Sequence, residues 1–201
     1  MLSIRRLTAD PTMLDALLEH PTLGLRWAGQ LVDDPELNLA GVPASIAHAH
    51  VLARGCSPLV GTLLKSPGTP APGAPRAGAD SPNLGRGIGF DVVMPAPLGL
   101  SMLVGVVNAQ QREELLAAHR QAVDATVRFL EDQIHHRFIV LQVDLDRHDG
   151  EAFVHTHNVI FSVSRIAGAW SPFFPRELHR HVGSAAALYQ ATLAKLTPYN
   201  G

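Results

Sequence analysis

The sequence predicts an α+β fold, in which helices pack on a central antiparallel sheet. Two segments, 141–146 and 153–164, alternate apolar and polar residues with a period of two, which is typical of β-strands. The Asp149-Gly150 pair between them predicts a tight hairpin turn, so the two strands run antiparallel. Residues 110–133 carry apolar side chains at spacings of three and four, which predicts an amphipathic helix lying on that sheet.

The N-terminal part of the chain predicts a strand, a helix and a small helical lobe. Residues 2–7 are expected to form the strand, and Asp10 and Pro11 then suit the N-cap and the first position of a helix. The lobe is expected over 21–64, with its clearest helix at 44–54. Its expected core contacts are Trp27, Leu37, Leu39, Ile46, Val51 and Leu52.

A loop, a strand and further helices are expected in the remainder of the chain. Residues 66–89 are rich in proline, glycine, alanine and serine, so they predict a flexible loop. A strand at 90–94 and a short buried helix at 98–107 are expected next. After the hairpin, 166–175 predicts a turn and a short edge strand, and 184–196 predicts a final helix with an apolar stripe.

The composition indicates a folded protein without a membrane-spanning segment. The chain has 201 residues, 46% of them hydrophobic, and residues 1–201 are expected to form a single domain. No apolar run approaches the ~20 residues of a membrane helix. Cys56 is the one cysteine, which excludes an intrachain disulfide and favours a cytoplasmic location. The net charge of −2 does not indicate a nucleic-acid-binding protein, so any DNA contact must depend on local charge.

His155 and His157 form the most informative pair of side chains in the sequence. Alternation in a strand places both imidazoles side by side on one face. If Asp149-Gly150 is a two-residue turn, Asp144 faces His155 and Gln142 faces His157. The expected hairpin face then carries Gln142, Asp144, Asp146, His148, His155 and His157.

Imidazoles and carboxylates together suit a divalent metal such as Mn, Zn, Ni or Mg. Asp144 is expected either to bind the metal or to accept a hydrogen bond from a histidine that binds it. The alternative is a surface strand that shows the His-X-His spacing by chance, because the chain contains 11 histidines.

Several segments, in order along the chain, match the pattern of one protein family. They are Met1 to Leu7 with Ala9-Asp10-Pro11, Gly89-Phe90-Asp91-Val92-Val93-Met94-Pro95-Ala96-Pro97, Ala118-His119 with Ala122-Val123, His155-Thr156-His157, and Leu188-Tyr189-Gln190-Ala191. Together they resemble the relaxase domain of TrwC-type (MobF) conjugative relaxases, which belong to the His-hydrophobic-His endonucleases. The resemblance spans nearly the whole chain and implies a relaxase-like fold.

This resemblance implies a DNA-processing function. In the family, a tyrosine attacks a phosphodiester of single-stranded DNA at a transfer origin, while a metal held by three histidines polarises the scissile phosphate. By position, His155 and His157 are implied metal ligands and His148 is the implied third ligand. Asp91 is implied as the acid that helps to activate the tyrosine. Other relaxosome proteins are implied partners, and no membrane is.

The sequence departs from the family at the nucleophile. Ala16-Leu17 stands where the first tyrosine pair belongs, and residues 21–26 stand where the second pair belongs. Residues 1–188 contain no tyrosine, while Tyr189 matches a packing position and Tyr199 lies near the end of the chain. The family lysine after Ser-Ala-Pro is also absent. The sequence also stops where a complete relaxase would continue into a helicase.

We therefore expect a relaxase-like domain that binds single-stranded DNA and a divalent metal but is deficient in tyrosine-dependent nicking, as a pseudoenzyme would be. Candidate phosphate contacts are Arg5, Arg6, Arg165 and Arg180. One alternative is a metal-dependent phosphodiesterase that uses water as nucleophile, with Asp91 or Asp144 as base. The other is a non-catalytic remnant or protein-interaction domain. The missing tyrosine leaves open whether the chain is an enzyme.

Overall fold

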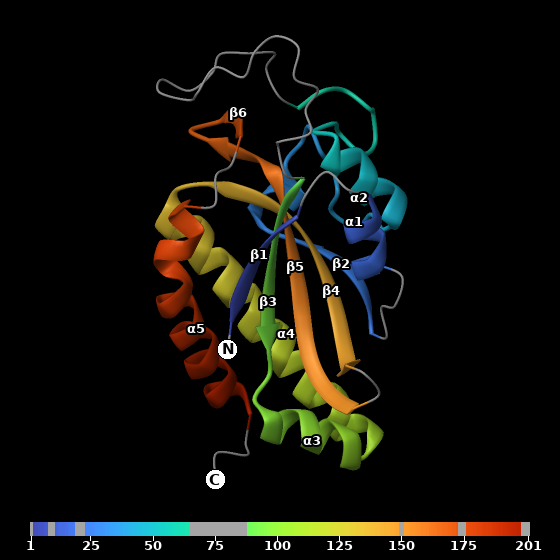
Figure 1. Ribbon diagram of the computed structural model, residues 1–201, viewed down its shortest axis with the longest axis vertical. Helices are drawn as coiled ribbons and strands as arrows, with labels where there is room; N and C mark the ends of the chain where they lie inside the picture. Colours follow the sequence, from blue (N-terminus) through green and yellow to red (C-terminus); the bar gives the residue numbers. More distant parts are fainter. Residues whose placement is uncertain are drawn as a thin grey trace.

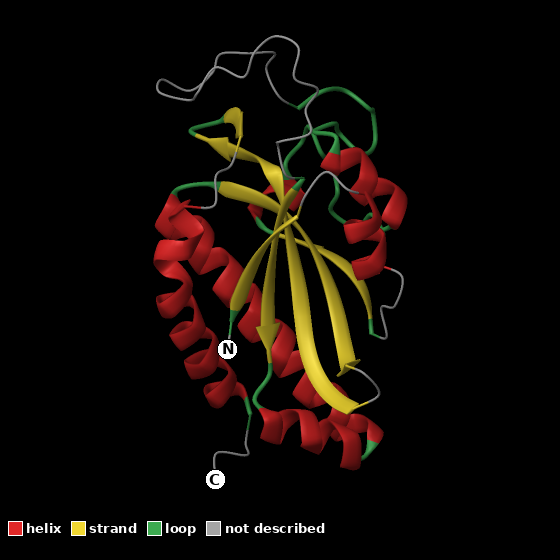
Figure 2. Ribbon diagram, in the orientation of Figure 1, coloured by secondary structure: helices red, strands yellow, loops and turns green. Residues whose placement is uncertain are grey.

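The sheet lies between two sets of helices, as Figures 1 and 2 show. The computed structural model describes residues 2–7, 11–18, 23–64, 88–148, 151–172 and 176–197. Its elements are β1 (Ser3–Leu7), α1 (Pro11–Leu18), β2 (Gly24–Ala28), the 3₁₀ helix η1 (Gln30–Asp33), α2 (Ile46–Ala53), β3 (Gly89–Pro95), α3 (Leu98–Val106), α4 (Ala109–Ile134), β4 (Arg137–His148), β5 (Glu151–Ile166), β6 (Ala169–Pro172) and α5 (Arg176–Leu196). This architecture confirms the predicted α+β class.

The described strands form one antiparallel sheet with β5 at its centre. The order is β1-β3-β5-β4-β2, and β6 pairs with the far end of β5. The long β4–β5 hairpin is the predicted one, although its turn at Asp149 and Gly150 lies outside the described residues. Because β5 pairs with both β3 and β4, side chains from three strands meet around it.

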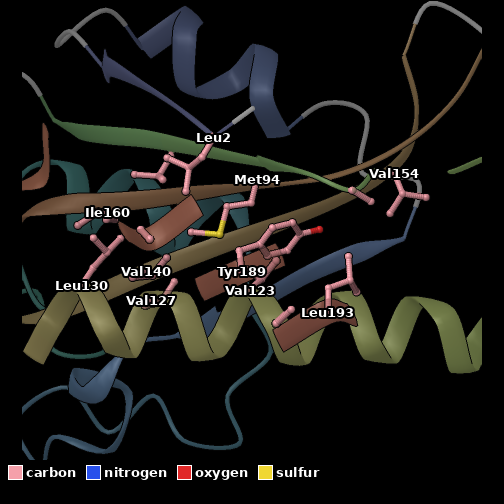
Figure 3. Close-up of a cluster of buried hydrophobic side chains, with 14 of the residues drawn as sticks. Leu2, Met94, Val123, Val127, Leu130, Val140, Val154, Ile160, Tyr189 and Leu193 are labelled. Carbon is pink, nitrogen blue, oxygen red and sulfur yellow. The ribbon is translucent and has the colours of Figure 1, made fainter. Parts of the chain in front are cut away.

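Helices α4 and α5 bury one face of the sheet. Asn108 and Gln111 form a capping box that starts α4, with a 2.9 Å bond from the Gln111 backbone N–H to Asn108. The apolar stripe of α4 then packs on the sheet and on α5, as Figure 3 shows. The labelled residues of this core are Leu2, Met94, Val123, Val127, Leu130, Val140, Val154, Ile160, Tyr189 and Leu193.

The second face of the sheet is covered by α1, η1, α2 and the segments around them. Leu14 of α1, Leu31 of η1 and Leu52 of α2 are almost completely buried against strand residues such as Val159 and Phe161. The small lobe predicted over 21–64 is therefore present, but it contains strand β2 as well as helix.

Four details of the fold differ from the sequence-based expectation. Strand β2 was not predicted, because five residues are too few to establish a period. Helix α5 begins at Arg176 rather than 184, since its polar first turns lack an apolar stripe. Helix α3 is not fully buried, and Met102 is 61% exposed. Ile46 is 40% exposed and does not belong to the core.

Other expectations fall on residues that the structure does not describe. Most of the predicted loop at 66–89 and the expected N-cap Asp10 lie outside the described residues, whereas Gly89 belongs to β3. Within the described residues, no helix is both long and apolar enough to cross a membrane.

A buried carboxyl group joins the end of α4 to two other segments. Glu131 is only 2% exposed, and its Oε1 accepts bonds from the backbone N–H groups of Gln30 (2.8 Å) and Phe138 (2.7 Å). Burial raises the pKa of Glu131 from 4.5 to about 7, against the effect of these hydrogen bonds. The folded protein therefore binds this proton more tightly than the unfolded chain does.

The Glu131→Gln variant is expected to gain stability relative to the parent as the pH rises. A raised carboxyl pKa favours folding below pH 4.5, and this contribution is lost as the pH rises to about 7. Glutamine keeps the acceptor oxygen without the charge, so the difference in unfolding free energy should shift by roughly 3 kcal/mol. Chemical denaturation at pH 4.5 and pH 8 measures this shift. A difference that is the same at both pH values would contradict the assignment.

Candidate functional site

His155 and His157 lie on the central strand, on the face that also carries the lobe. In a strand every second residue points to the same face, so His155 and His157 share a face with Val159 and Phe161, and Thr156 points to the other. Val159 and Phe161 are part of the lobe core. Their ring centroids are 5.1 Å apart with an interplanar angle of 67°. The predicted pairing of the two imidazoles on one strand face is therefore present in the fold.

A buried carboxylate on the neighbouring strand holds one of these rings. Asp91 of β3 pairs with Val159, so His157 is its diagonal neighbour across the strands. His157 Nδ1 lies 3.0 and 2.9 Å from the two Asp91 carboxylate oxygens. The Asp91 side chain is fully buried, and Oδ2 also accepts a 3.1 Å bond from Arg5 on β1.

These contacts determine which ring nitrogen carries the proton. A carboxylate only accepts hydrogen bonds, so His157 Nδ1 carries a proton and Nε2 is the ring nitrogen left to bind a metal ion. His155 Nδ1 likewise donates to the backbone oxygen of Phe153 at 2.8 Å. Both imidazoles therefore have the tautomer that a metal ligand needs, with the second nitrogen held by an acceptor.

The expected carboxylate neighbours on β4 lie on the opposite face. His155 pairs with Leu145 and His157 with Val143, while Asp144 pairs with Thr156. The register prediction was wrong because a bulge between Leu145 and Arg147 shifts the hairpin by one residue, which moves alternate side chains to the other face. On that face Gln142 bonds to Asp124, Asp144 to Arg120 and Asp146 to Arg112, all from α4.

The third ligand is the least defined part of the site. His148 ends β4, where its backbone pairs with Glu151, and its side chain lies outside the described residues. Among the described residues, no group of three or more histidine, cysteine, aspartate or glutamate side chains is arranged to hold a metal ion. Within the described residues, the candidate site therefore contains two histidine side chains that lie close together.

Two histidines with these tautomers fit a divalent transition metal as half of its ligand set. Zinc–nitrogen bonds are about 2.0–2.1 Å long, so two imidazoles on one tetrahedral ion have ring centroids roughly 5 Å apart. The observed centroid separation of 5.1 Å agrees with this spacing. Imidazole ligands suit Zn, Ni or Cu, and a neighbouring carboxylate extends the choice to Mn.

The four candidate phosphate contacts lie in different environments. Arg5 borders the histidine site through Asp91, and its side chain is 54% exposed. Arg6 is exposed and follows Arg5 on β1, so the two point to opposite faces. Arg165 bonds to Asp34 and Glu36, and its guanidinium lies 4.4 Å from the Trp170 ring centroid. Arg180 pairs with Glu177 on the surface of α5.

Tyr189 lies on the face opposite the histidines. It is 3% exposed in the core between α4 and α5, in agreement with the packing role expected from the sequence. Burial raises the pKa of its phenol above the usual value. Ala16 and Leu17 lie in α1, and neither has an ionisable group. The second predicted region, 21–26, is only partly within the described residues.

Asp91 was singled out from the sequence, but its contact with His157 was not predicted. Asp91 was expected to act on a tyrosine, whereas its carboxylate contacts His157 and Arg5. The pairing of β3 with β5 creates this contact, and the sequence contains no local signal for it. A role for Thr156, between the two histidines, was not predicted either. A polar residue on the inner face of a central strand nevertheless indicates a buried hydrogen-bond partner.

Comparisons with known proteins agree with the fold. Residues 18–201 match the sequence model of the family described as TrwC relaxase. The metal-bound structure of the conjugative relaxase TrwC with oriT DNA has a TM-score of 0.76 at 21% identity, covering 98% of this chain and 69% of that chain. The metal-free complex has a TM-score of 0.75 at 22% identity, covering 98% of this chain and 68% of that chain. The copper-bound complex gives 0.74 at 21% identity, with coverages of 98% and 69%. No curated protein matches the chain.

Proposed function

Because the chain belongs to the TrwC relaxase family, we propose that it is a relaxase-like DNA-processing domain that binds single-stranded DNA and a divalent metal ion. The solved TrwC structures that it resembles are described as complexes with oriT DNA, with bound metal and with copper. On this proposal residues 1–201 act as one cytoplasmic domain, and other relaxosome proteins are its protein partners.

The observation that supports the metal site best is the contact between His157 and Asp91. A buried carboxylate that accepts the Nδ1 proton fixes the ring orientation and makes Nε2 a better electron-pair donor. His155 and His157 would hold the ion, with His148 as the third ligand that the resemblance implies. The ion would supply positive charge next to the oxygens of a bound phosphodiester.

Arg5 is the arginine best placed to contact that phosphodiester. Its Nη2 bonds to Asp91, while more than half of its side chain stays exposed to solvent. A guanidinium has five donors, so one bond to Asp91 leaves others for phosphate oxygens. Arg165 is only 16% exposed, and two carboxylates already bind it.

We propose that the domain does not form a covalent tyrosyl adduct with DNA. In the first helix, Ala16 and Leu17 have no group that can attack phosphorus. Tyr189 is buried on the other side of the sheet, and its hydroxyl lies 2.8 Å from His119 Nδ1. Tyr199 lies outside the described residues.

The water-dependent phosphodiesterase is less well supported than the DNA-binding proposal. It requires Asp91 or Asp144 to act as base. The fully buried Asp91 side chain is bonded to Arg5 and His157, and Asp144 lies on the α4 face with Thr156 and Arg120. Neither carboxylate has the access to solvent that a water-activating base needs.

The DNA proposal predicts salt-dependent binding without a covalent product. The protein is mixed with labelled single-stranded DNA and Mn²⁺, binding is measured at several salt concentrations, and samples are then boiled in detergent. We expect a complex that weakens as salt rises, and no labelled protein after denaturation. A labelled adduct would contradict the proposed loss of nicking, and an absence of complex at low salt would contradict DNA binding.

Arg5→Gln and Arg180→Gln form a matched pair for the same assay. Their side chains are 54% and 55% exposed, and each arginine pairs with one carboxylate residue. Loss of Arg5 is expected to weaken binding for all DNA sequences and to lower the slope of the salt dependence by about 1. Loss of Arg180 is expected to leave both quantities unchanged. Equal effects of the two substitutions would place the DNA elsewhere on the surface.

A further inference from the structure

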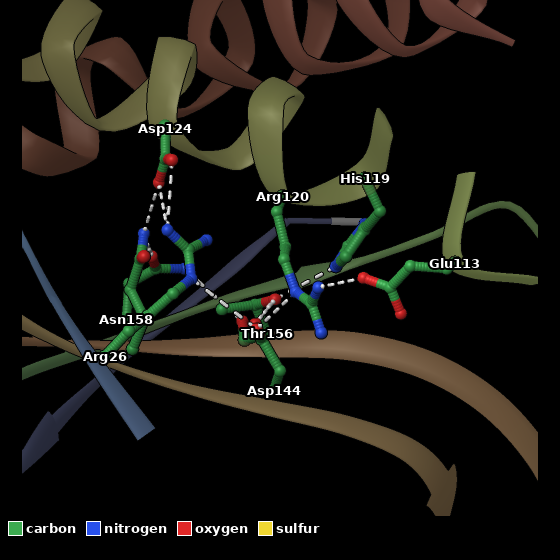
Figure 4. A network of polar contacts seen from close by, with 9 residues as sticks. Arg26, Glu113, His119, Arg120, Asp124, Asp144, Thr156 and Asn158 are labelled. Carbon is green, nitrogen blue, oxygen red and sulfur yellow. Dashed lines mark hydrogen bonds and ion pairs between the residues drawn. The ribbon is translucent and has the colours of Figure 1, made fainter. Parts of the chain in front are cut away.

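A series of buried hydrogen bonds joins α5 and α4 to β5 and β4, and Figure 4 shows the part of it that runs from His119 through Thr156 to Asp144. Tyr189 of α5 lies 2.8 Å from His119 Nδ1 of α4, and His119 Nε2 lies 2.9 Å from the Thr156 hydroxyl. Thr156 in turn donates to Asp144 Oδ1 at 2.7 Å. Each of the four residues is at most 5% exposed.

Each proton in this series of hydrogen bonds has one defined position. Asp144 is held next to two cations, with Arg120 Nε at 3.1 Å and Arg26 Nε at 3.5 Å from Oδ2, so it acts as the acceptor for the Thr156 hydroxyl. The Thr156 oxygen must then accept the His119 Nε2 proton, because its own proton is already donated. The neutral His119 ring therefore accepts the Tyr189 proton at Nδ1.

The protonation state of His119 agrees with this order. Burial lowers the pKa of His119 from 6.5 to about 4, although the nearby Asp144 charge opposes the shift. The ring is neutral at physiological pH, with one donor and one acceptor nitrogen. The chain of bonds therefore has a single direction, from the α5 helix through α4 to β5 and β4.

Thr156 is the residue between His155 and His157. Its side chain points away from the two imidazoles, toward α4, so its hydroxyl anchors β5 from behind at the centre of the pair. The β4–β5 ladder is less regular nearby, because its register shifts between Leu145 and Arg147, next to the residue that pairs with His155. The β4 ladder alone therefore constrains the hairpin end of β5 beyond His155 less than a continuous pairing would, while β3 pairs with residues 155–161 without a register shift.

We propose that Thr156, His119, Tyr189 and Asp144 are positioning residues for the histidine site. Their bonds fix the rotation of β5 relative to α4 and α5, so that His155 and His157 present their Nε2 atoms together. This inference rests on the proposed metal-binding function. It implies that residues on the α4 face of the sheet control the geometry of the two histidines on the opposite face.

Fold stability alone does not account for this polar chain. A buried polar network replaced by apolar residues of similar volume is often neutral or even stabilising. Thr156 lies on the same face of β5 as the apolar core residues Val154 and Ile160, opposite Met94 of β3. Four connected polar groups do, however, define one geometry, since every member must keep its partner.

Thr156→Val tests the proposal, with Thr156→Ser as the conservative variant and Thr126→Val as the matched control. Thr126 is also fully buried, but its hydroxyl bonds only to the Ala122 backbone oxygen within α4. Calorimetry with Mn²⁺ and Zn²⁺ is expected to show that Thr156→Val weakens metal binding by about tenfold, in the range found for groups that orient ligands. Thr156→Ser and Thr126→Val are expected to bind metal like the parent.

A second readout does not depend on the metal. In metal-free protein, nitrogen NMR should show His157 protonated at Nδ1 and a slowly exchanging proton there in the parent and in Thr126→Val. Thr156→Val is expected to lose the slow exchange, and Tyr189→Phe to change it in the same direction by less. If the parent binds no metal, the proposed function fails, and this NMR comparison alone decides the positioning role. Unchanged His157 signals and metal affinity in folded Thr156→Val would overturn the proposal.

Discussion

Replacing Asp91 with alanine is expected to weaken divalent-metal binding by about 10- to 100-fold. Asp91 is the acceptor that holds His157 Nδ1, and its side chain is fully buried. Without it, the ring can rotate and exchange tautomers, and its Nδ1 proton has no partner on that side. Leaving one buried donor unpaired also lowers the stability by about 1–3 kcal/mol. Titration calorimetry and denaturant unfolding measure the two effects separately.

Asp124→Ala is the matched control for Asp91→Ala. Asp124 is an aspartate with two polar partners, Arg26 and Gln142, but it lies on α4 at the opposite face of the sheet. Its loss is expected to change stability without changing metal affinity. Asp91→Asn should have an intermediate effect, because its amide oxygen still accepts the Nδ1 proton without the negative charge. Equal metal affinities for Asp91→Ala and the parent would refute the role of this carboxylate.

Gly89→Ala is expected to destabilise the protein by about 3 kcal/mol. Gly89 begins β3 and pairs with Leu7 on one side and Phe161 on the other. An added Cβ would collide with the Ile160 backbone oxygen and would lie 3.1 Å from the Phe161 Cα. These are backbone atoms, so they cannot rotate away, and β3 must separate locally from β5. A lowered denaturation midpoint would be the direct observation.

Gly99→Ala makes the same chemical change where there is space. Gly99 is exposed in α3, and an added Cβ would meet nothing within 4 Å. Gly99 lies in the first turn of α3, where alanine fits the backbone and reduces the conformational freedom of the unfolded chain, so this variant should be as stable as the parent or more stable. If the two alanine variants had the same stability, this result would contradict the close approach of the β3 and β5 backbones at Gly89.

The sequence predicted those parts of the fold in which the period of apolar residues is long. Helix α4 has 26 residues and strand β5 has 16, so their patterns are unambiguous. Strand β2 was missed because it has only five residues. The start of α5 was missed because residues 176–183 are mostly polar, and tertiary packing of Leu178 is what holds this part of the helix on the core.

The shared face of the two histidines in the candidate site was predicted from the sequence, but their neighbours were not. Alternation was sufficient to place His155 and His157 on one face, since it depends only on the local strand. The neighbours across the hairpin depend on register, and one bulge moved Asp144 to the other face. Asp91 reaches His157 only through the β3–β5 pairing, which joins residues that are far apart in the sequence. Such long-range pairs are not encoded in any local pattern.

Titration of metal-stripped protein with Mn²⁺ and Zn²⁺ tests the central claim most directly, with the His155→Ala/His157→Ala variant measured beside the parent. His155 is 4% exposed and the His157 side chain 15%, so circular dichroism of the variant must first confirm that it folds. We expect the parent to bind one ion per chain and the variant to bind none. If the two proteins bind metal equally, or if the parent binds none, the two histidines are not a metal site, and the chain shares only the fold and family of the relaxases.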